Sequence, residues 1–146
     1  MTQLIGWKDH IDLPEFVLMD IPAKIDTGAK TSVLHCRQVE LIKKGRKQFV
    51  RFVPLDDRFG CSDKVYILPF YSERKIRNSF GQEENRYIIK TKIVLFNQTF
   101  DIELSLRDRA GMEFPVLLGR SFIRRKFLVD VSKSNVSKKQ KTAKTN

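Results

Sequence analysis

The sequence is poor in cysteine and histidine. Its 146 residues contain 2 cysteines, Cys36 and Cys61, and 2 histidines, His10 and His35. So few cysteines exclude a fold held together by several disulfides, and neither a His-Glu-x-x-His pattern nor cysteines at zinc-ligand spacing are present. We therefore expect two free thiols, no metal and no cofactor.

Long apolar runs and nucleotide-binding motifs are also missing. No apolar stretch approaches the roughly 18 to 20 residues of a membrane-spanning helix, and residues 1–7 lack the basic start and long apolar segment of a signal peptide. A Gly-x-x-x-x-Gly-Lys-Ser/Thr phosphate loop is absent, so any ATP dependence would belong to a partner. These absences favour a cytoplasmic protein with no membrane contact.

Acidic residues are scarce relative to basic ones. The 28 Lys and Arg residues outnumber 17 Asp and Glu residues, which gives a net charge of +11 at pH 7. This excess favours acidic partners such as RNA, ribosomes or glutamate-rich peptides, and a lysine-rich solubilising surface explains it equally well. Residues 132–146 contain almost nothing to bury, so we expect one folded domain over residues 1–131 and a disordered basic tail over residues 132–146.

Alternation of apolar and polar residues predicts strands through most of the body. The clearest segments are residues 87–95 and 100–106, and Asn97-Gln98 between them fits a short hairpin connection. In that hairpin, Asp101 and Glu103 would pair with Lys90 or Lys92 across the strands. The pattern predicts an all-β fold, a closed lobe of six or seven strands, with one short helix in residues 119–126.

One carboxylate, Asp26, stands where an expected strand enters a turn. It is followed by the hydroxyl of Thr27, the turn-permissive Gly28 and the small Ala29, beside which two backbones can pack closely. A lone motif of this kind is also consistent with an ordinary Asx-type turn after a strand.

The segment Asp26-Thr27-Gly28-Ala29 resembles the Asp-Thr-Gly-Ala signature of retropepsin-like aspartic proteases. Residues 114–120, Phe-Pro-Val-Leu-Leu-Gly-Arg, resemble the hydrophobic-hydrophobic-Gly segment that follows it in those proteins. With the flanking residues, the match extends over about residues 5–131 and is similar to a bacterial retropepsin-like family labelled ATP-dependent zinc protease. Some members of that family are encoded beside an ATP-grasp ligase that adds glutamates to a ribosomal protein. The flanking segments are Gly6-Trp7 and residues 24–35, 86–89, 112–120 and 127–130.

This resemblance implies a single-lobe, retropepsin-like closed β-barrel that acts as a homodimeric endopeptidase. Asp26 from each copy would be catalytic, because two aspartates that share one proton can activate water and polarise a peptide carbonyl. Thr27, Gly28, Ala29 and Gly119 would support the site. The residues expected to bind a peptide or protein substrate, possibly an acidic one, are Lys24, Lys30, Arg120, and Ser79 and Gly81 in a flap-like loop.

A second interpretation keeps the fold but not the chemistry. Lys24 shares a strand face with Asp26, and a nearby lysine favours ionisation of both carboxylates, which would prevent them from sharing a proton. The chain would then be a non-proteolytic binding module that recruits a glutamate ligase or an acidic or ribosomal partner through its basic surface.

Overall fold

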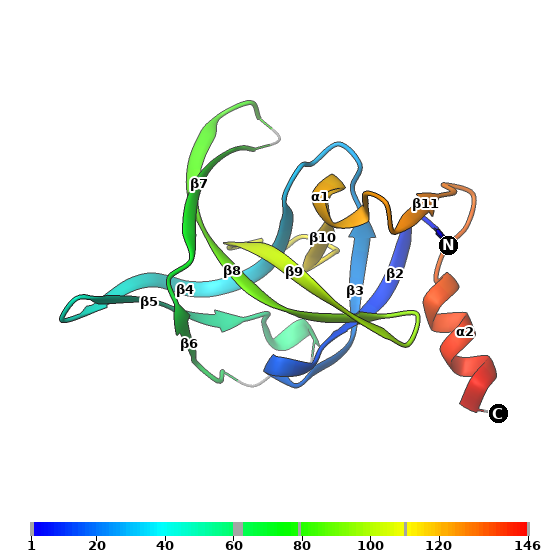
Figure 1. The fold of residues 1–146 in the computed structure, drawn as a ribbon, viewed down its shortest axis with the longest axis horizontal. Helices are drawn as coiled ribbons and strands as arrows, with labels where there is room; N and C mark the ends of the chain where they lie inside the picture. Colours follow the sequence, from blue (N-terminus) through cyan, green and yellow to red (C-terminus); the bar gives the residue numbers. More distant parts are fainter. Residues whose placement is uncertain (1, 60–62, 79, 110, 146) are drawn as a thin grey trace.

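The structure, a computed structural model, describes residues 2–59, 63–78, 80–109 and 111–145. Most of the chain is strand (57%) and little of it is helical (11%), which confirms the all-β prediction. Figure 1 shows the arrangement of the elements. In chain order they are β1 (Gln3–Ile5), β2 (Lys8–Leu13), the 3-10 turn η1 (Pro14–Phe16), β3 (Leu18–Ile25), β4 (Ser32–Lys44), β5 (Lys47–Pro54), η2 (Asp57–Phe59), β6 (Tyr66–Pro69), β7 (Ser72–Arg77), β8 (Glu83–Leu95), β9 (Gln98–Arg107), β10 (Val116–Leu118), α1 (Arg120–Ile123), β11 (Phe127–Val129) and α2 (Val136–Thr145).

The main sheet closes on itself through six strands. Their order is β10, β3, β2, β8, β9 and β4, and β4 returns to β10 through antiparallel pairing. At the two ends of this order, β10 pairs in parallel with β3 and β4 pairs in parallel with β9. The prediction of a closed lobe is therefore confirmed, as is the short helix after Gly119.

Side chains on the inner face of this ring form the core, because alternate residues of a strand point to opposite faces of a sheet. Leu34, Ile89, Leu104 and Leu118 come from four different strands, and each is fully buried. The β8–β9 hairpin turns at Phe96 and Asn97 with the predicted partners, Lys92 opposite Asp101 and Lys90 opposite Glu103. Lys92 and Asp101 form an ion pair.

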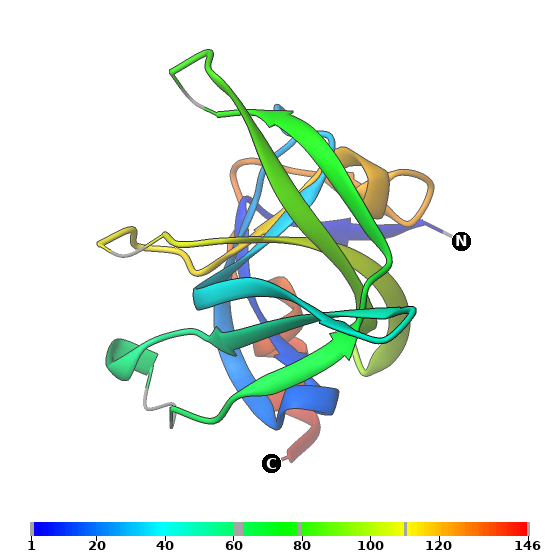
Figure 2. The same ribbon diagram turned by 90° about the vertical axis from the view of Figure 1, so that its left-hand side faces the viewer.

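Two pieces of the sheet project from the ring. The β4–β5 hairpin is extended by β6, and β7 pairs only with β8 among the described strands. In Figures 1 and 2, the tip of the β7–β8 hairpin and the connection between β3 and β4 rise at the same end of the molecule. The expected flap-like loop is therefore the turn of a long hairpin. Gly81 and the exposed Phe80 lie in it, whereas Ser79 falls outside the described residues.

The prediction of a disordered tail is wrong for residues 132–145. α2 begins at Val136, and the carboxylate of Asp9, which is 1% exposed, accepts the N–H groups of Ser137 (2.9 Å) and Lys138 (3.2 Å). Ser137 Oγ in turn accepts the N–H of Phe96 at 2.8 Å. A carboxylate at a helix N-terminus satisfies free N–H groups and opposes the helix dipole. Because this cap comes from β2, the composition of the tail does not reveal it.

No helix within the described ranges is both long enough and apolar enough to cross a membrane.

Candidate active site

Asp26 follows β3 directly and is held by backbone contacts on both sides. Its N–H donates to Leu118 O on β10 (2.9 Å), and its own carbonyl accepts the N–H of Ala29 (3.2 Å). Its half-buried carboxylate accepts the N–H of Gly28 at Oδ1 (3.0 Å). Within the described part of the chain, no second carboxylate is hydrogen-bonded to it. Asp26 is therefore a fixed, solvent-accessible acid at a turn.

The loop that carries Asp26 rests on the start of α1. The N–H groups of Arg120 and Ser121 donate to the carbonyls of Ala29 (2.8 Å) and Lys30 (3.0 Å). Arg120 Nη1 also donates to the carbonyl of exposed Thr27 (3.0 Å). Arg120, expected to bind substrate, thus braces the Asp26 turn in this structure.

Gly119 sits where these two backbones meet. Its N–H donates to the buried Ser32 Oγ at 3.0 Å. A Cβ atom at this position would lie 2.9 Å from both Ala29 O and Thr31 C, closer than such atoms approach in proteins. The resemblance gave Gly119 a supporting role, and the close packing supplies a physical reason for it.

We expect Gly119→Ala to destabilise the fold by about 1–3 kcal/mol, the usual cost of overpacking a tight contact. The atoms that crowd the new methyl group are backbone atoms, so the Asp26 loop itself must shift. Urea unfolding measures the loss. The exposed Ser121→Ala in α1 is the matched control, and equal stability of the two variants would contradict this packing argument.

The other residues expected to bind substrate lie around this loop. Lys24 is exposed on β3, opposite Lys8 of β2 and Leu117 of β10, and Lys30 is exposed in the loop itself. Neither lysine forms an ion pair among the described residues. Gly81 is exposed at the tip of the β7–β8 hairpin. The structure thus leaves these three positions open to solvent.

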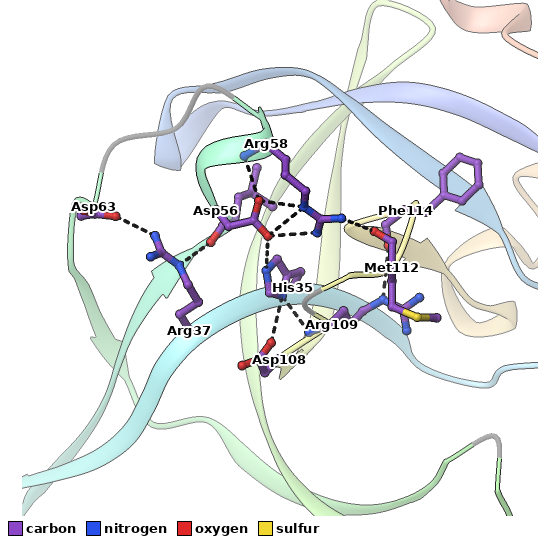
Figure 3. Close-up of polar contacts among 10 residues, drawn as sticks. His35, Arg37, Asp56, Arg58, Asp63, Asp108, Arg109, Met112 and Phe114 are labelled. Carbon is purple, nitrogen blue, oxygen red and sulfur yellow. Dashed lines mark hydrogen bonds and ion pairs between the residues drawn. The ribbon is translucent and has the colours of Figure 1, made fainter.

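A polar network around His35 was missed by sequence analysis (Figure 3). His35 on β4 is fully buried, and its Nδ1 accepts the backbone N–H of Arg109 at 2.7 Å. Because Nδ1 is an acceptor, the ring proton lies on Nε2 and is donated to Asp56 Oδ2 at 2.9 Å. The network fixes the orientation of the His35 ring and ties residue 109 to β4.

Arg58 completes this network. It clamps Asp56 through Nε to Oδ1 (3.0 Å) and Nη2 to Oδ2 (2.9 Å), and its Nη1 donates to Met112 O (2.8 Å). These bonds, the Arg58 guanidinium foremost and the His35 contact after it, lower the pKa of Asp56 from an ordinary 3.8 to about 2. The Arg109 and Met112 contacts together hold the segment that leads from β9 to β10.

This pKa predicts an acid-dependent contribution to stability. A carboxylate whose pKa is lower in the folded than in the unfolded protein stabilises the fold above about pH 4, and this contribution is lost as pH falls toward 2. The free energy of unfolding of the parent should therefore exceed that of Asp56→Asn by more near neutral pH than near pH 2. Urea unfolding at both pH values measures this difference. Asp63→Asn, at a mostly exposed ion pair, is the control, and a pH-independent difference for Asp56→Asn would refute the prediction.

Arg109 is electrostatically coupled to the catalytic candidate. Its side chain is held by Nε, which donates to Phe114 O at 3.2 Å. Burial lowers the pKa of Arg109, and the nearby charges of Arg107 and Arg86 lower it further. The Asp26 carboxylate opposes this shift, so these two groups lie within electrostatic range. No sequence motif marked Arg109, because its role depends on contacts with strands distant in the chain.

No group of three or more His, Cys, Asp or Glu side chains among the described residues is arranged to hold a metal ion. Cys36 is buried, which raises the pKa of its thiol well above the usual range, and Cys61 falls outside the described residues.

A six-strand ring that presents an Asp-Thr-Gly turn beside a hydrophobic-hydrophobic-Gly strand is the architecture of a retropepsin-like lobe. The chain belongs to the family of the retropepsin-like aspartic endopeptidase RimB, whose model matches residues 4–140. This finding confirms the resemblance seen in the sequence.

Similar proteins include much longer chains. A Desulfotalea psychrophila protein is 32% identical over 129 residues, and a Shewanella pealeana protein is 31% identical over 137 residues; both are named probable alpha-L-glutamate ligase. These matches cover 88% and 90% of this chain, which spans only 28% and 29% of those relatives.

The fold also recurs in a crystal structure of a Legionella pneumophila protein of unknown function. The TM-score is 0.76 and the identity 24%, over 94% of this chain and 99% of that one. At this identity the match supports the fold alone.

Proposed function

We propose that this protein is a homodimeric aspartic endopeptidase that hydrolyses peptide bonds with one Asp26 from each copy. The observation that carries the proposal is the single Asp26 carboxylate, fixed by Leu118 and Gly28 at an accessible turn of a retropepsin-like lobe. Two-fold association places the same loop of each chain against its copy, so a dimer supplies the second acid.

Such a pair performs acid–base catalysis because two adjacent carboxylates share one proton. The ionised Asp26 takes a proton from a water molecule, which attacks the peptide carbonyl carbon. The protonated Asp26 donates to the carbonyl oxygen, and the amine leaves after it gains a proton. Since the two chains are equivalent, either copy can take either role.

Exposed apolar side chains support self-association. Leu4 on β1 and Leu128 on β11 lie side by side in a two-stranded parallel sheet and are 38% and 63% exposed. Each of these strands has only one neighbour among the described strands, so their outer edges are open to pairing. Phe80 at the tip of the β7–β8 hairpin is 85% exposed. A second copy would cover these groups.

An acidic peptide is the substrate class that fits best. The net charge is +11, and Lys24 and Lys30 are exposed beside Asp26. The relatives named as glutamate ligases suggest a link with glutamate-rich chains, including a ligase or ribosomal partner. The test is cleavage of glutamate-rich peptides by the purified protein, followed by mass spectrometry across a range of protein concentrations and compared with sedimentation of the same samples.

A binding module on the same fold is the second candidate. It is favoured by relatives in which the matching segment is less than a third of a probable ligase. In this case the protein binds an acidic or ligase partner in a salt-sensitive way and cleaves nothing. If the protein cleaves peptides and the cleavage depends on Asp26, binding is not its whole function.

A further inference from the structure

We propose that Arg86, Arg107 and Arg109 form a carboxylate-binding subsite beside Asp26, which selects a glutamyl or aspartyl side chain or a terminal carboxylate of the peptide. The inference rests on the proposed function, because it assumes that a peptide lies across Asp26. We call these three residues the arginine cluster.

The arginine cluster lies on the sheet face opposite the main core. Val33, Ser105 and Ile88 are adjacent across β4, β9 and β8, and these three side chains point away from the core residues Leu34 and Leu104. Two residues further along the same face come Arg86 on β8, Arg107 on β9 and His35 on β4. The backbone N–H of Arg109 is bonded to that same His35 ring. Three strands and one loop thus bring the three arginines together.

Burial makes this cluster unusual. Arg86 is 6% exposed and Arg109 is 9% exposed, although arginine is rarely buried unless it is paired. Burial is the main cause that lowers the pKa of both residues, and the positive charge of Arg107 lowers each pKa further. The three guanidinium groups therefore repel one another in a partly desolvated place.

Glu84 is the carboxylate that pairs with the arginine cluster, and Asp26 lies within electrostatic range of Arg109. Glu84 Oε1 accepts from Arg86 Nε at 2.7 Å and lies 3.3 Å from Arg107 Nε, so one carboxylate serves two arginines. Asp56 is already clamped by Arg58.

Arg109 is positioned to bind an anion. Its Nε is used by Phe114 O, and its two terminal nitrogens have no hydrogen bond among the described residues. A guanidinium fork matches a carboxylate with two parallel hydrogen bonds, and partial burial strengthens that interaction. Phe114, whose carbonyl accepts from Arg109 Nε, packs against the Trp7 ring (centroids 6.1 Å apart). Trp7 O accepts the N–H of Ile25, the residue before Asp26, at 2.9 Å, so these contacts link Arg109 to the strand that carries Asp26. A peptide carboxylate would supply the missing negative charge.

The test measures binding separately from cleavage. In an Asp26→Asn background, fluorescence anisotropy follows a labelled hexaglutamate peptide and its hexaglutamine counterpart, each with a free or an amidated C-terminus, at low ionic strength. Arg109→Gln and Arg107→Gln should each weaken binding of hexaglutamate roughly 10- to 100-fold, the usual effect of losing a charged hydrogen bond. Hexaglutamine should bind weakly to every variant. Arg109→Lys should restore only part of the affinity, because lysine keeps the charge without the fork.

Arg46→Gln is the matched control, since Arg46 is exposed at the β4–β5 turn and carries the same charge. Thermal unfolding of each variant checks that it folds. An equal loss in Arg46→Gln and Arg109→Gln, or equal binding of hexaglutamine and hexaglutamate, would overturn the inference. If only hexaglutamate with a free C-terminus binds, the subsite holds the terminal carboxylate. If the amidated hexaglutamate binds equally well, the subsite holds a glutamyl side chain. Either result supports a carboxylate subsite.

The same experiment separates this inference from the proposed function. Arginine-dependent binding by a protein that never cleaves supports the subsite and contradicts the endopeptidase. Cleavage that needs Asp26 but is indifferent to the arginine cluster supports the endopeptidase and contradicts the subsite.

Discussion

Asp26→Asn should lower peptide cleavage by ~10² to 10⁴-fold, the usual contribution of a positioned acid–base group. Asparagine keeps the size of the side chain, and its amide oxygen can still accept the N–H of Gly28 that holds the turn. It cannot exchange a proton, so neither water activation nor protonation of the carbonyl oxygen remains. Folding should survive, and self-association should be unchanged or tighter, because two facing carboxylates no longer repel each other.

Cleavage rates of parent and variant, measured on the same glutamate-rich peptide, give the size of the effect. Asp63→Asn is the control, because its carboxylate is mostly exposed and pairs only with Arg37 among the contacts described above. Activity of the parent should also disappear on dilution below the dimer dissociation constant, since a single chain carries half of the pair. Full activity of Asp26→Asn, or cleavage by a strictly monomeric sample, would show that the shared-aspartate mechanism is wrong.

Deleting residues 132–146 should lower the free energy of unfolding by about 2–4 kcal/mol, the largest stability effect that we expect. The deletion removes the N–H groups that donate to the Asp9 carboxylate and the Ser137 hydroxyl that accepts the N–H of Phe96. Each such bond contributes about 0.5–1.5 kcal/mol, and bonds to a charged group contribute more. The conformational entropy regained by the released segment offsets part of this loss.

The midpoint of thermal unfolding should fall by about 10 °C for a chain of this size. The control is deletion of residues 142–146, because the tail contacts with Asp9 and Phe96 are made by Ser137 and Lys138, which this deletion keeps. The Gly6 contact gives an independent check: a Cβ there would lie 2.1 Å from Lys133 O, so Gly6→Ala should displace the same segment. An unchanged melting temperature after the long deletion would mean that the tail contributes nothing to stability.

The strand pattern predicted much of the fold because alternation depends on each strand alone. Residues 87–95 and 100–106 were recognised as a hairpin, and the structure pairs Lys92 with Asp101 as expected. The flap-like loop was less predictable. Residues 72–77 are charged at positions 73, 74, 75 and 77 and contain little to bury, yet they pair with β8 because backbone hydrogen bonds do not require apolar side chains.

Sequence analysis found the site residues that belong to short motifs and missed those that only the fold brings together. Asp26, Thr27, Gly28 and Gly119 were identified because their spacing follows a local motif. His35 and Arg109 were not, because a buried histidine and one arginine among 28 basic residues carry no signal until the fold joins them.

The sequence by itself determined the all-β class, the turn that carries Asp26 and the family resemblance, since each depends on neighbouring residues or on a short motif. Only the tertiary structure decided the closure of the sheet, the docking of α2 on Asp9 and the assembly of the arginine cluster. The physical reason is that these features are made by hydrogen bonds and charges between residues far apart in the chain. Their strength depends on burial and distance, which composition and periodicity do not specify.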